Sequence, residues 1–183
     1  MRANRVRDAW AAGRAVINGW CGIPSSFSAE LMANLGWDSL VVDMQHGVVD
    51  YQMMVTMFQG ISTTDATPMV RVPWNDPAHI MKALDAVYVG PSDLSITMGL
   101  PPGLDKTDAR MIANLKKILD GCRRHGVKAG IHTGGPAYAK RMIEMGYNFT
   151  TIMGDAALLR MAASQVLQQM REGAPAARST GPY

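Results

Sequence analysis

The chain has 183 residues, a formal net charge of +3 and 48% hydrophobic residues, which is the composition of one ordinary globular domain. Its basic residues are scattered, which argues against a nucleic-acid-binding surface. No apolar run reaches membrane-spanning length, and the N-terminus has no continuous apolar core, so we expect neither a membrane partner nor a signal peptide. Cys21 and Cys122 form no disulfide framework or zinc spacing, which favours a cytoplasmic location.

Short apolar segments alternate with amphipathic ones along the chain. The pattern predicts strands over 17–23, 39–46, 68–74, 87–89, 128–134 and 149–155. The helices are predicted over about 26–35, after Asp50, after Asp76, over about 107–125, up to Gly146 and over about 156–171. In the first of these helices, Phe27, Leu31 and Leu35 share the face that we expect to be buried. Six β-α units in strict alternation predict an α/β fold with a parallel sheet covered by helices.

We expect residues 1–171 to form a single domain, and residues 172–183 to be a disordered tail because they have no periodicity. One junction inside the domain is unusual. The helix ending in LDA (84–86) runs directly into the strand VYV, without the glycine or polar turn that a helix needs before a parallel strand. An irregular connection built on Asp85 and Ala86 is one explanation. Two missing β-α units are the other, since a closed (β/α)₈ barrel needs eight.

Polar side chains stand where the predicted strands end. In a parallel α/β fold the carboxyl ends of the strands meet at one edge, where the functional site usually lies. Several of these polar or aromatic residues are candidates for such a site, and any one of them could instead be an ordinary loop residue. The candidates are Trp20, Asp43, His46, Arg71, Ser92, Asp93 and His132.

Asp43 and His46 lie three residues apart at a strand-to-loop transition. A carboxylate beside an imidazole can fix its tautomer and raise its basicity, which suits a general base. Both residues could instead cap the loop. Arg71 lies inside an apolar strand, where it is costly unless it meets an anion such as a carboxylate or an enolate oxygen. An internal ion pair with Asp43 is the alternative, and both interactions could hold together.

The turn Gly90-Pro91-Ser92 precedes Asp93. Backbone N–H groups of Gly90 and Ser92 could bind an anionic group. The Asp93 carboxylate could ligate a divalent cation, because hard cations prefer carboxylate oxygens. One carboxylate alone is weak support for a metal site.

Three segments carry a family resemblance: WCGIPSSFSAELMANLGWDSLVVDMQHG, VRVPWNDPAHIMKALDA and VYVGPSDLSITMG. Together they resemble the HpcH/HpaI aldolase family over roughly residues 5 to 170. The resemblance implies a (β/α)₈ TIM barrel and a class II aldolase. Such an enzyme reversibly cleaves 4-hydroxy-2-oxo acids to pyruvate, or a related 2-oxo acid, and an aldehyde. The implied cofactor is a divalent metal, Mg²⁺, Mn²⁺ or Co²⁺.

The resemblance also implies roles for individual residues. His46 matches the catalytic histidine, Asp43 its carboxylate partner, and Arg71 the arginine that contacts the 2-oxo group. Asp93 matches one of two carboxylate metal ligands. The Gly90–Ser92 turn matches the backbone that receives the substrate carboxylate, and we place Trp20 with the substrate-binding residues. Gln45 departs from the glutamate of some members.

The larger departure is at the junction between Ala86 and Val87. There the resemblance places the fourth and fifth β-α units, together with the second metal ligand, a glutamate that ends strand five. A real deletion and a segment left out of the chain would give the same sequence. A 183-residue chain with an open sheet and one metal-ligand carboxylate is expected to be weakly active or inactive.

Two other functions stay open. One is a lyase of the citrate-lyase β-subunit type that acts on a CoA thioester, although no adenine-binding segment is apparent. The other is a catalytically dead structural paralogue with a role in assembly. The resemblance further implies a homo-oligomer, a hexamer or trimer. The basic N-terminal segment and the last helix, with Leu159, Ala162, Val166 and Met170 in line, could pack on a neighbouring subunit.

Overall fold

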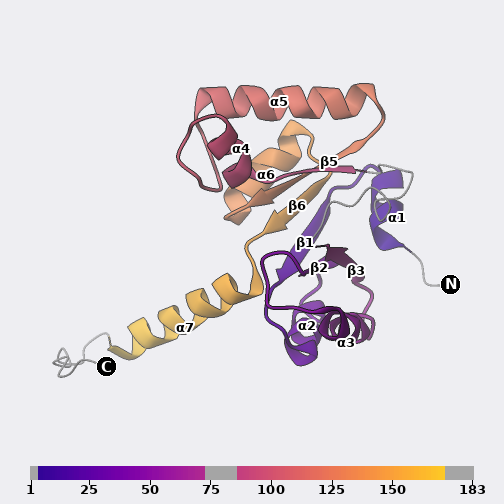
Figure 1. Cartoon of the computed structure of the whole chain (residues 1–183), viewed down its shortest axis with the longest axis vertical. Helices are drawn as coiled ribbons and strands as arrows, with labels where there is room; N and C mark the ends of the chain where they lie inside the picture. The colour runs from indigo at the N-terminus through magenta and orange to yellow at the C-terminus, as the bar shows by residue number, and fades with distance from the viewer. Residues whose placement is uncertain (1–3, 73–85, 172–183) are drawn as a thin grey trace.

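A six-stranded parallel sheet forms the centre of the molecule. The structure is a computed structural model that describes residues 4–72 and 86–171. The strands are β1 (Val16–Cys21), β2 (Ser39–Asp43), β3 (Thr67–Arg71), β4 (Ala86–Val89), β5 (Lys128–Thr133) and β6 (Phe149–Ile152). Their order is β3-β2-β1-β6-β5-β4, and every neighbouring pair is parallel. The predicted parallel sheet is confirmed, and it curls into half of a barrel (Figure 1).

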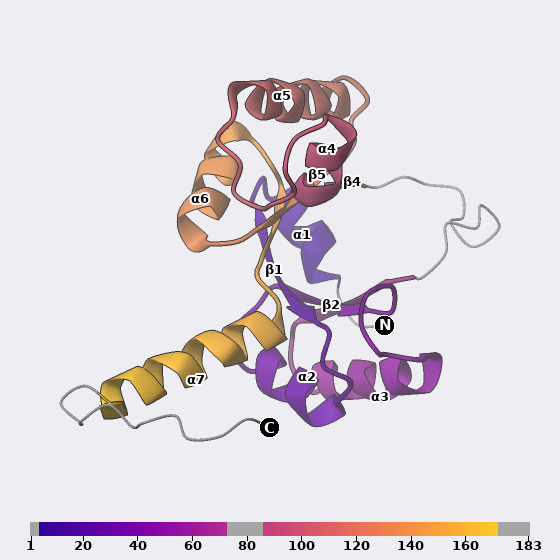
Figure 2. The ribbon, with the colours of Figure 1, turned by 60° about the vertical axis from the view of Figure 1, so that its left-hand side comes forward.

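Helices cover the outer side of the curled sheet in two groups (Figures 1 and 2). The helices are α1 (Arg5–Ala11), α2 (Ser26–Ala33), α3 (Tyr51–Ile61), α4 (Pro91–Thr97), α5 (Ala109–Arg124), α6 (Pro136–Met145) and α7 (Asp155–Arg171). One buried cluster joins α2 and α3 to β2 and the end of β1. A second joins α5 and α6 to β4 and β5. Strand β1 pairs with β6 and so links the two halves.

The helix ends follow the local sequence signals. The Asp50 side chain accepts a hydrogen bond from the Met53 N–H at 2.8 Å, as expected of the residue that caps α3. Gly126 follows α5 with φ of +66°, and Gly146 follows α6 with φ of +116°. Both are in the left-handed region that favours glycine, so these residues end the helices as predicted.

The predicted buried face of α2 is wrong. Phe27, Leu31 and Leu35 are 68%, 54% and 71% exposed. The reason is the close packing of α2 on α3, where a side chain at Gly60 would place its Cβ 2.8 Å from the Ser26 carbonyl oxygen. Such an approach requires a compact face on α2, and that face consists of Ala29, Met32 and Ala33.

Two short helices were not predicted. Helix α1 packs Val6 and Ala9 against Val16 and Phe149, at the end of the sheet where the strands begin. One face of the N-terminal segment therefore covers the chain's own sheet, and its packing on a neighbouring subunit stays a prediction. Helix α4 begins at Pro91, directly after β4, and proline is well tolerated at this first helical position.

Some predictions fall outside the described residues. These are the helix after Asp76, the proposed connection at Asp85, and the disordered tail over 172–183. Within the described part of the chain, β3 and β4 are the two edge strands of the sheet. None of the helices in that part is both long and apolar enough to cross a membrane.

Candidate active site

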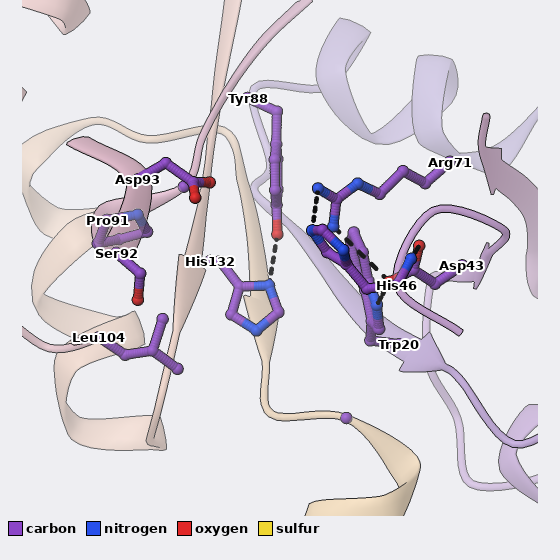
Figure 3. Close-up of a pocket in the computed structure, with 12 residues that line it drawn as sticks. Trp20, Asp43, His46, Arg71, Tyr88, Pro91, Ser92, Asp93, Leu104 and His132 are labelled. Carbon is purple, nitrogen blue, oxygen red and sulfur yellow. Dashed lines mark hydrogen bonds and ion pairs between the residues drawn. The ribbon is translucent and has the colours of Figure 1, made fainter. Parts of the chain in front are cut away.

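The seven residues predicted to form the site line a single pocket of about 620 Å³, together with five others. The pocket lies where β1, β2, β3 and β4 end, so the carboxyl ends of parallel strands bring these side chains together. Figure 3 shows one group on the side of β1 to β3, and another on the side of β4 and α4. The predicted residues in the pocket are Trp20, Asp43, His46, Arg71, Gly90, Ser92 and Asp93.

Asp43 is the most deeply buried of these residues, with 4% exposure. Its Oδ1 accepts hydrogen bonds from the backbone N–H groups of Gln45 at 2.9 Å and His46 at 3.1 Å. Its Oδ2 accepts from Trp20 Nε1 at 3.1 Å and lies 3.6 Å from Arg71 Nη1. A buried carboxylate with this many donors is well satisfied, and it shapes the loop after β2.

Arg71 lies between Asp43 and His46. Its Nη2 is 3.1 Å from His46 Nε2, and its guanidinium carbon is 5.7 Å from the centroid of the Trp20 ring. Arginine has no acceptor atom and stays charged, so it must donate to Nε2. His46 is therefore neutral in this arrangement, with its ring proton on Nδ1.

The expected contact between the Asp43 carboxylate and the His46 imidazole is not present. Asp43 binds the backbone N–H of His46, and Arg71 contacts the ring. Both alternatives weighed from the sequence, a loop cap and an Asp43–Arg71 ion pair, are the observed interactions. The sequence spacing placed the residues together but could not distinguish a backbone contact from a ring contact.

Asp93 lies on the other side of the pocket, in the first turn of α4 (Figure 3). Its carboxylate lies directly over Gly90, so that a Cβ at Gly90 would be 2.5 Å from Asp93 Oδ2. A side chain larger than hydrogen at position 90 would push the carboxylate away. Gly90 therefore sets where the Asp93 oxygens lie.

The described residues do not by themselves complete a site for a divalent metal. Across residues 4–72 and 86–171, no group of three or more His, Cys, Asp or Glu side chains could hold an ion. Asp43 is occupied by its N–H donors and by Arg71. Among the described residues, Asp93 is thus the acidic residue of the pocket whose oxygens form no hydrogen bond or ion pair.

Tyr88 and His132 also line the pocket, and their side chains meet there. Tyr88 Oη is 2.9 Å from His132 Nδ1. From the sequence, His132 was a candidate without an assigned role, and Tyr88 was not considered. The alternation of side chains along paired strands could have revealed them. Tyr88 pairs with Gly130, so His132, two residues further on, has its side chain on the same face.

Burial and nearby charges keep this pair uncharged. Burial lowers the pKa of His132, and the positive charge of Arg71 lowers it further, while Asp105 and Asp43 oppose the shift. Burial raises the pKa of the Tyr88 phenol. Near neutral pH both side chains are therefore neutral hydrogen-bonding groups.

The loop after α4 brings Leu104 to the pocket. Its position is fixed by two neighbours in sequence. Asp105 accepts a hydrogen bond from Gly134 N at 2.6 Å, and the Lys106 carbonyl accepts one from Tyr138 Oη at 2.7 Å. Leu104 consequently supplies an apolar wall beside Ser92 (Figure 3).

No protein-family profile matches the chain, but individual relatives do. It is 24% identical to a hydroxypyruvate/pyruvate aldolase from Rhizorhabdus wittichii over 248 aligned positions, which cover 92% of this chain and 99% of the relative. It is 41% identical to a 4-hydroxy-2-oxo-heptane-1,7-dioate aldolase from Salmonella dublin over 95 residues, 52% of this chain. That second match spans only 35% of the relative's length.

The fold has close counterparts among solved structures. An HpcH/HpaI aldolase/citrate lyase family protein from Burkholderia cenocepacia superposes with a TM-score of 0.81 and 17% identity, covering 92% of this chain and all of the other. At this identity the match concerns the fold alone. The sequence matches establish homology with aldolases, and the fold agrees with it. The chain is therefore a homologue of these aldolases, and its fold is that of HpcH/HpaI aldolase family proteins.

Proposed function

We propose that the chain is built to cleave 4-hydroxy-2-oxo acids reversibly into pyruvate, or a related 2-oxo acid, and an aldehyde. The observation that carries the proposal is the position of Arg71. It is held by Asp43 and Trp20, donates to His46 and faces the pocket that also contains Asp93. The named activities of the two aldolase relatives support the same reaction class.

Arg71 is proposed to bind the 2-oxo oxygen of the substrate. When C–C cleavage leaves an enolate, the fixed guanidinium stabilises the negative oxygen at no further cost in reorganisation. His46 is proposed to act as the general base. Its Nε2 lone pair now accepts from Arg71, so a substrate oxygen that takes the Arg71 N–H frees this lone pair to receive the proton of the 4-hydroxyl group.

The substrate carboxylate is proposed to lie against the Gly90–Ser92 turn, and Trp20 to form the adjoining wall. Trp20 is fixed at both ends of its side chain, by its hydrogen bond to Asp43 and by Arg71 over its ring. Such a rigid wall restricts the bound 2-oxo acid to one orientation.

A divalent ion, Mg²⁺, Mn²⁺ or Co²⁺, is the proposed cofactor, and Asp93 its one ligand from the described residues. When bound, such an ion polarises the 2-oxo group as a Lewis acid. The remaining protein ligand is proposed to lie in β-α units that this chain lacks.

Two observations support the absence of the fourth and fifth β-α units between Ala86 and Val87. In a closed eight-stranded barrel, strand one pairs with both strand two and strand eight. The order β3-β2-β1-β6-β5-β4 matches that arrangement if β4, β5 and β6 correspond to barrel strands six, seven and eight. Barrel strands four and five are then the ones without a counterpart. The alignment with the Rhizorhabdus relative has 248 positions and the chain 183 residues, so at least 65 positions have no counterpart here. A hollow of about 290 Å³ lies between β3 and β4 and is lined by Met69, Val70 and Val87.

We further propose a homo-oligomer, a hexamer or trimer. Helix α7 projects from the body of the molecule (Figure 2), and large apolar side chains along it are exposed. The outer face of α2, misassigned from the sequence as buried, is apolar as well. The exposed side chains are Phe27, Leu31, Leu35, Leu159, Met161, Val166, Leu167 and Met170. Surfaces of this kind commonly mark protein contacts.

Pyruvate release from a 4-hydroxy-2-oxo acid, with and without EDTA, tests the proposed reaction. We expect slow release that EDTA abolishes, because one carboxylate holds the metal weakly. Release from a citryl-type CoA thioester instead would favour the citrate-lyase type of reaction. No release from any 2-oxo acid, even at high Mg²⁺ or Mn²⁺, would favour the dead structural paralogue.

A further inference from the structure

Neighbouring side chains hold Tyr88 and His132 in contact with each other. The Tyr88 ring lies over Gly130 on the neighbouring strand, where a Cβ would be 2.9 Å from Tyr88 Cδ2. The ring is stacked on Trp20 with centroids 6.0 Å apart, and it meets the edge of Phe149 at 6.1 Å. Trp20 also contacts His132 edge-on at 5.3 Å. The two side chains therefore have little freedom to turn away from each other.

A buried series of hydrogen bonds ends at Thr151, on the strand beside His132. Ser39 Oγ donates to Asn18 Oδ1 at 2.8 Å, and Asn18 Nδ2 donates to Thr151 Oγ1 at 3.0 Å. Ser39, Asn18 and Thr151 are all 0% exposed. Thr151 is paired in register with His132, and Tyr88 Oη lies 2.9 Å from His132 Nδ1.

The contact with Tyr88 assigns the tautomer of His132. Burial raises the pKa of Tyr88, so its phenol is protonated and has a hydrogen to donate. The Tyr88 hydrogen then goes to Nδ1 of His132. The proton of a neutral imidazole is consequently on Nε2. This atom has no protein partner among the described residues, and the His132 side chain lines the pocket (Figure 3).

A neutral N–H at this place suits a neutral oxygen better than a carboxylate. The pocket already has a cation for anionic oxygens in Arg71, whereas the wall formed by Tyr88 and His132 carries no charge. A single neutral hydrogen bond discriminates by about three- to tenfold between a ligand that has the acceptor and one that lacks it.

We propose that His132 donates from Nε2 to a hydroxyl oxygen carried by the substrate, and that Tyr88 is the positioning residue that fixes this donor. The hydroxyl group could belong to the 2-oxo acid or to the aldehyde. The proposal rests on the aldolase function for the class of ligand, and on the geometry of the pair for the donor.

The tautomer is tested by NMR of the ¹⁵N-histidine-labelled chain at pH 7.5. We expect His132 to show a proton on Nε2 and none on Nδ1, and Tyr88→Phe to give a mixture of tautomers while the ring packing is retained. His125→Gln, which removes an exposed histidine outside the pocket, is the matched control. A proton on Nδ1 in the unmodified chain, or an unchanged tautomer in Tyr88→Phe, would overturn the assignment.

Ligand preference is tested by titrating the labelled chain, in the presence of Mg²⁺, with hydroxypyruvate, pyruvate, glycolaldehyde and acetaldehyde. We expect the hydroxylated member of one pair to bind about three- to tenfold more tightly and to shift His132 Nε2. That pair identifies which half of the substrate carries the hydroxyl. His132→Gln, whose amide N–H can replace Nε2–H, should retain the preference, and His132→Phe should lose it.

The outcomes separate this proposal from the aldolase proposal. If none of the four probes shifts His132, or if His132→Phe keeps the preference, the donor role is wrong, whether or not pyruvate is released. If hydroxypyruvate binds through His132 but no 4-hydroxy-2-oxo acid is cleaved, the donor role holds and the proposed reaction fails.

Discussion

Arg71 joins three residues of the pocket at once, since its guanidinium contacts Asp43, His46 and the ring of Trp20. Lysine has one point charge and no planar fork, so it cannot make these contacts together. We expect Arg71→Lys to lower kcat/KM for a 4-hydroxy-2-oxo acid by about 10²-fold or more. The melting temperature should change little, because the side chain is 32% exposed.

Arg110→Lys is the matched control for this variant. Arg110 pairs only loosely with Asp108, at 3.7 Å, on an exposed surface. The control should leave both kcat/KM and the melting temperature unchanged. Equal activity in the two variants would show that Arg71 does not stabilise the enolate.

The lowered pKa of His132 predicts how the free energy of unfolding depends on pH. In the unfolded chain His132 should titrate near its ordinary pKa of about 6.5. In the fold its pKa is lowered by burial and by Arg71, against Asp105 and Asp43, with the neutral Tyr88 beside it. Below about pH 6.5 the unfolded chain binds a proton at His132 more readily than the folded chain does. The contribution of neutral His132 to the free energy of unfolding is therefore fully present above that pH. It is lost as the pH falls through the pKa of His132 in the folded state.

Urea unfolding of the unmodified chain and of His132→Gln, between pH 7.5 and 5, measures this effect. We expect a smaller loss of unfolding free energy in the variant over this range, because its side chain does not titrate. If the two curves stay parallel, the pKa of His132 is not lowered in the folded state.

At the scale of the elements, a glycine at the end of α6 and a glycine inside α5 give opposite predictions. Gly146 has φ of +116°, and a Cβ there would collide with the Arg123 guanidinium, which donates to the Met145 carbonyl at 3.0 Å. Gly146→Ala should therefore lower the free energy of unfolding by about 1–2 kcal/mol.

Gly121 lies inside α5 with nothing within 4 Å of the position of a Cβ. Gly121→Ala should raise the unfolding free energy by about 0.5–1 kcal/mol, since alanine loses less backbone entropy in a helix. Urea unfolding measures both variants. Equal effects would show that the left-handed cap at Gly146 contributes nothing to stability.

The sequence predicted the elements well where a local signal was present. Asp50, Gly126 and Gly146 mark helix ends by their own chemistry, and all three do so in the structure. The Gly-Pro pair at Gly90 and Pro91 was interpreted as a turn, although proline also suits the first position of a helix. The buried face of α2 could not be predicted, because it depends on the close approach of α3, a tertiary contact.

The sequence predicted which residues form the site, but not which of their atoms contact one another. Strand ends are conspicuous in the sequence, and so Arg71, His46 and Asp93 were found and all line one pocket. Which atom of His46 meets Asp43 depends on the loop conformation, which residue spacing does not specify. Tyr88 was not considered and His132 received no role, because their pairing depends on strand register, which places Tyr88 opposite Gly130.

For the whole molecule, the opening between β3 and β4 leads to a prediction about a longer chain. The segment of the Rhizorhabdus relative that has no counterpart here can be inserted between Ala86 and Val87. We expect the chimaera to release pyruvate at least about tenfold faster than the 183-residue chain, in a metal-dependent manner, because a complete set of ligands holds the ion.

Asp93→Asn in the same chimaera is the control, and it should lose the metal-dependent part of the rate. An insertion that folds, binds Mg²⁺ and releases pyruvate no faster would show that the absent units do not explain the incomplete site. A chimaera that is active as a monomer would contradict the proposed homo-oligomer.

The pairing of β1 with β6 joins residues separated by most of the described sequence, for example Asn18 and Thr151. Trp20, Asp43 and Arg71 belong to one side of this seam, and Asp93 and His132 to the other. During synthesis the first group can be in place long before Phe149–Ile152 leaves the ribosome. The complete pocket cannot form until that segment is available to pair with β1. Its assembly is a late folding event that depends on a distant strand pairing. Until then, the aromatic wall around Trp20 is exposed to whatever chaperones and proteases the nascent chain meets.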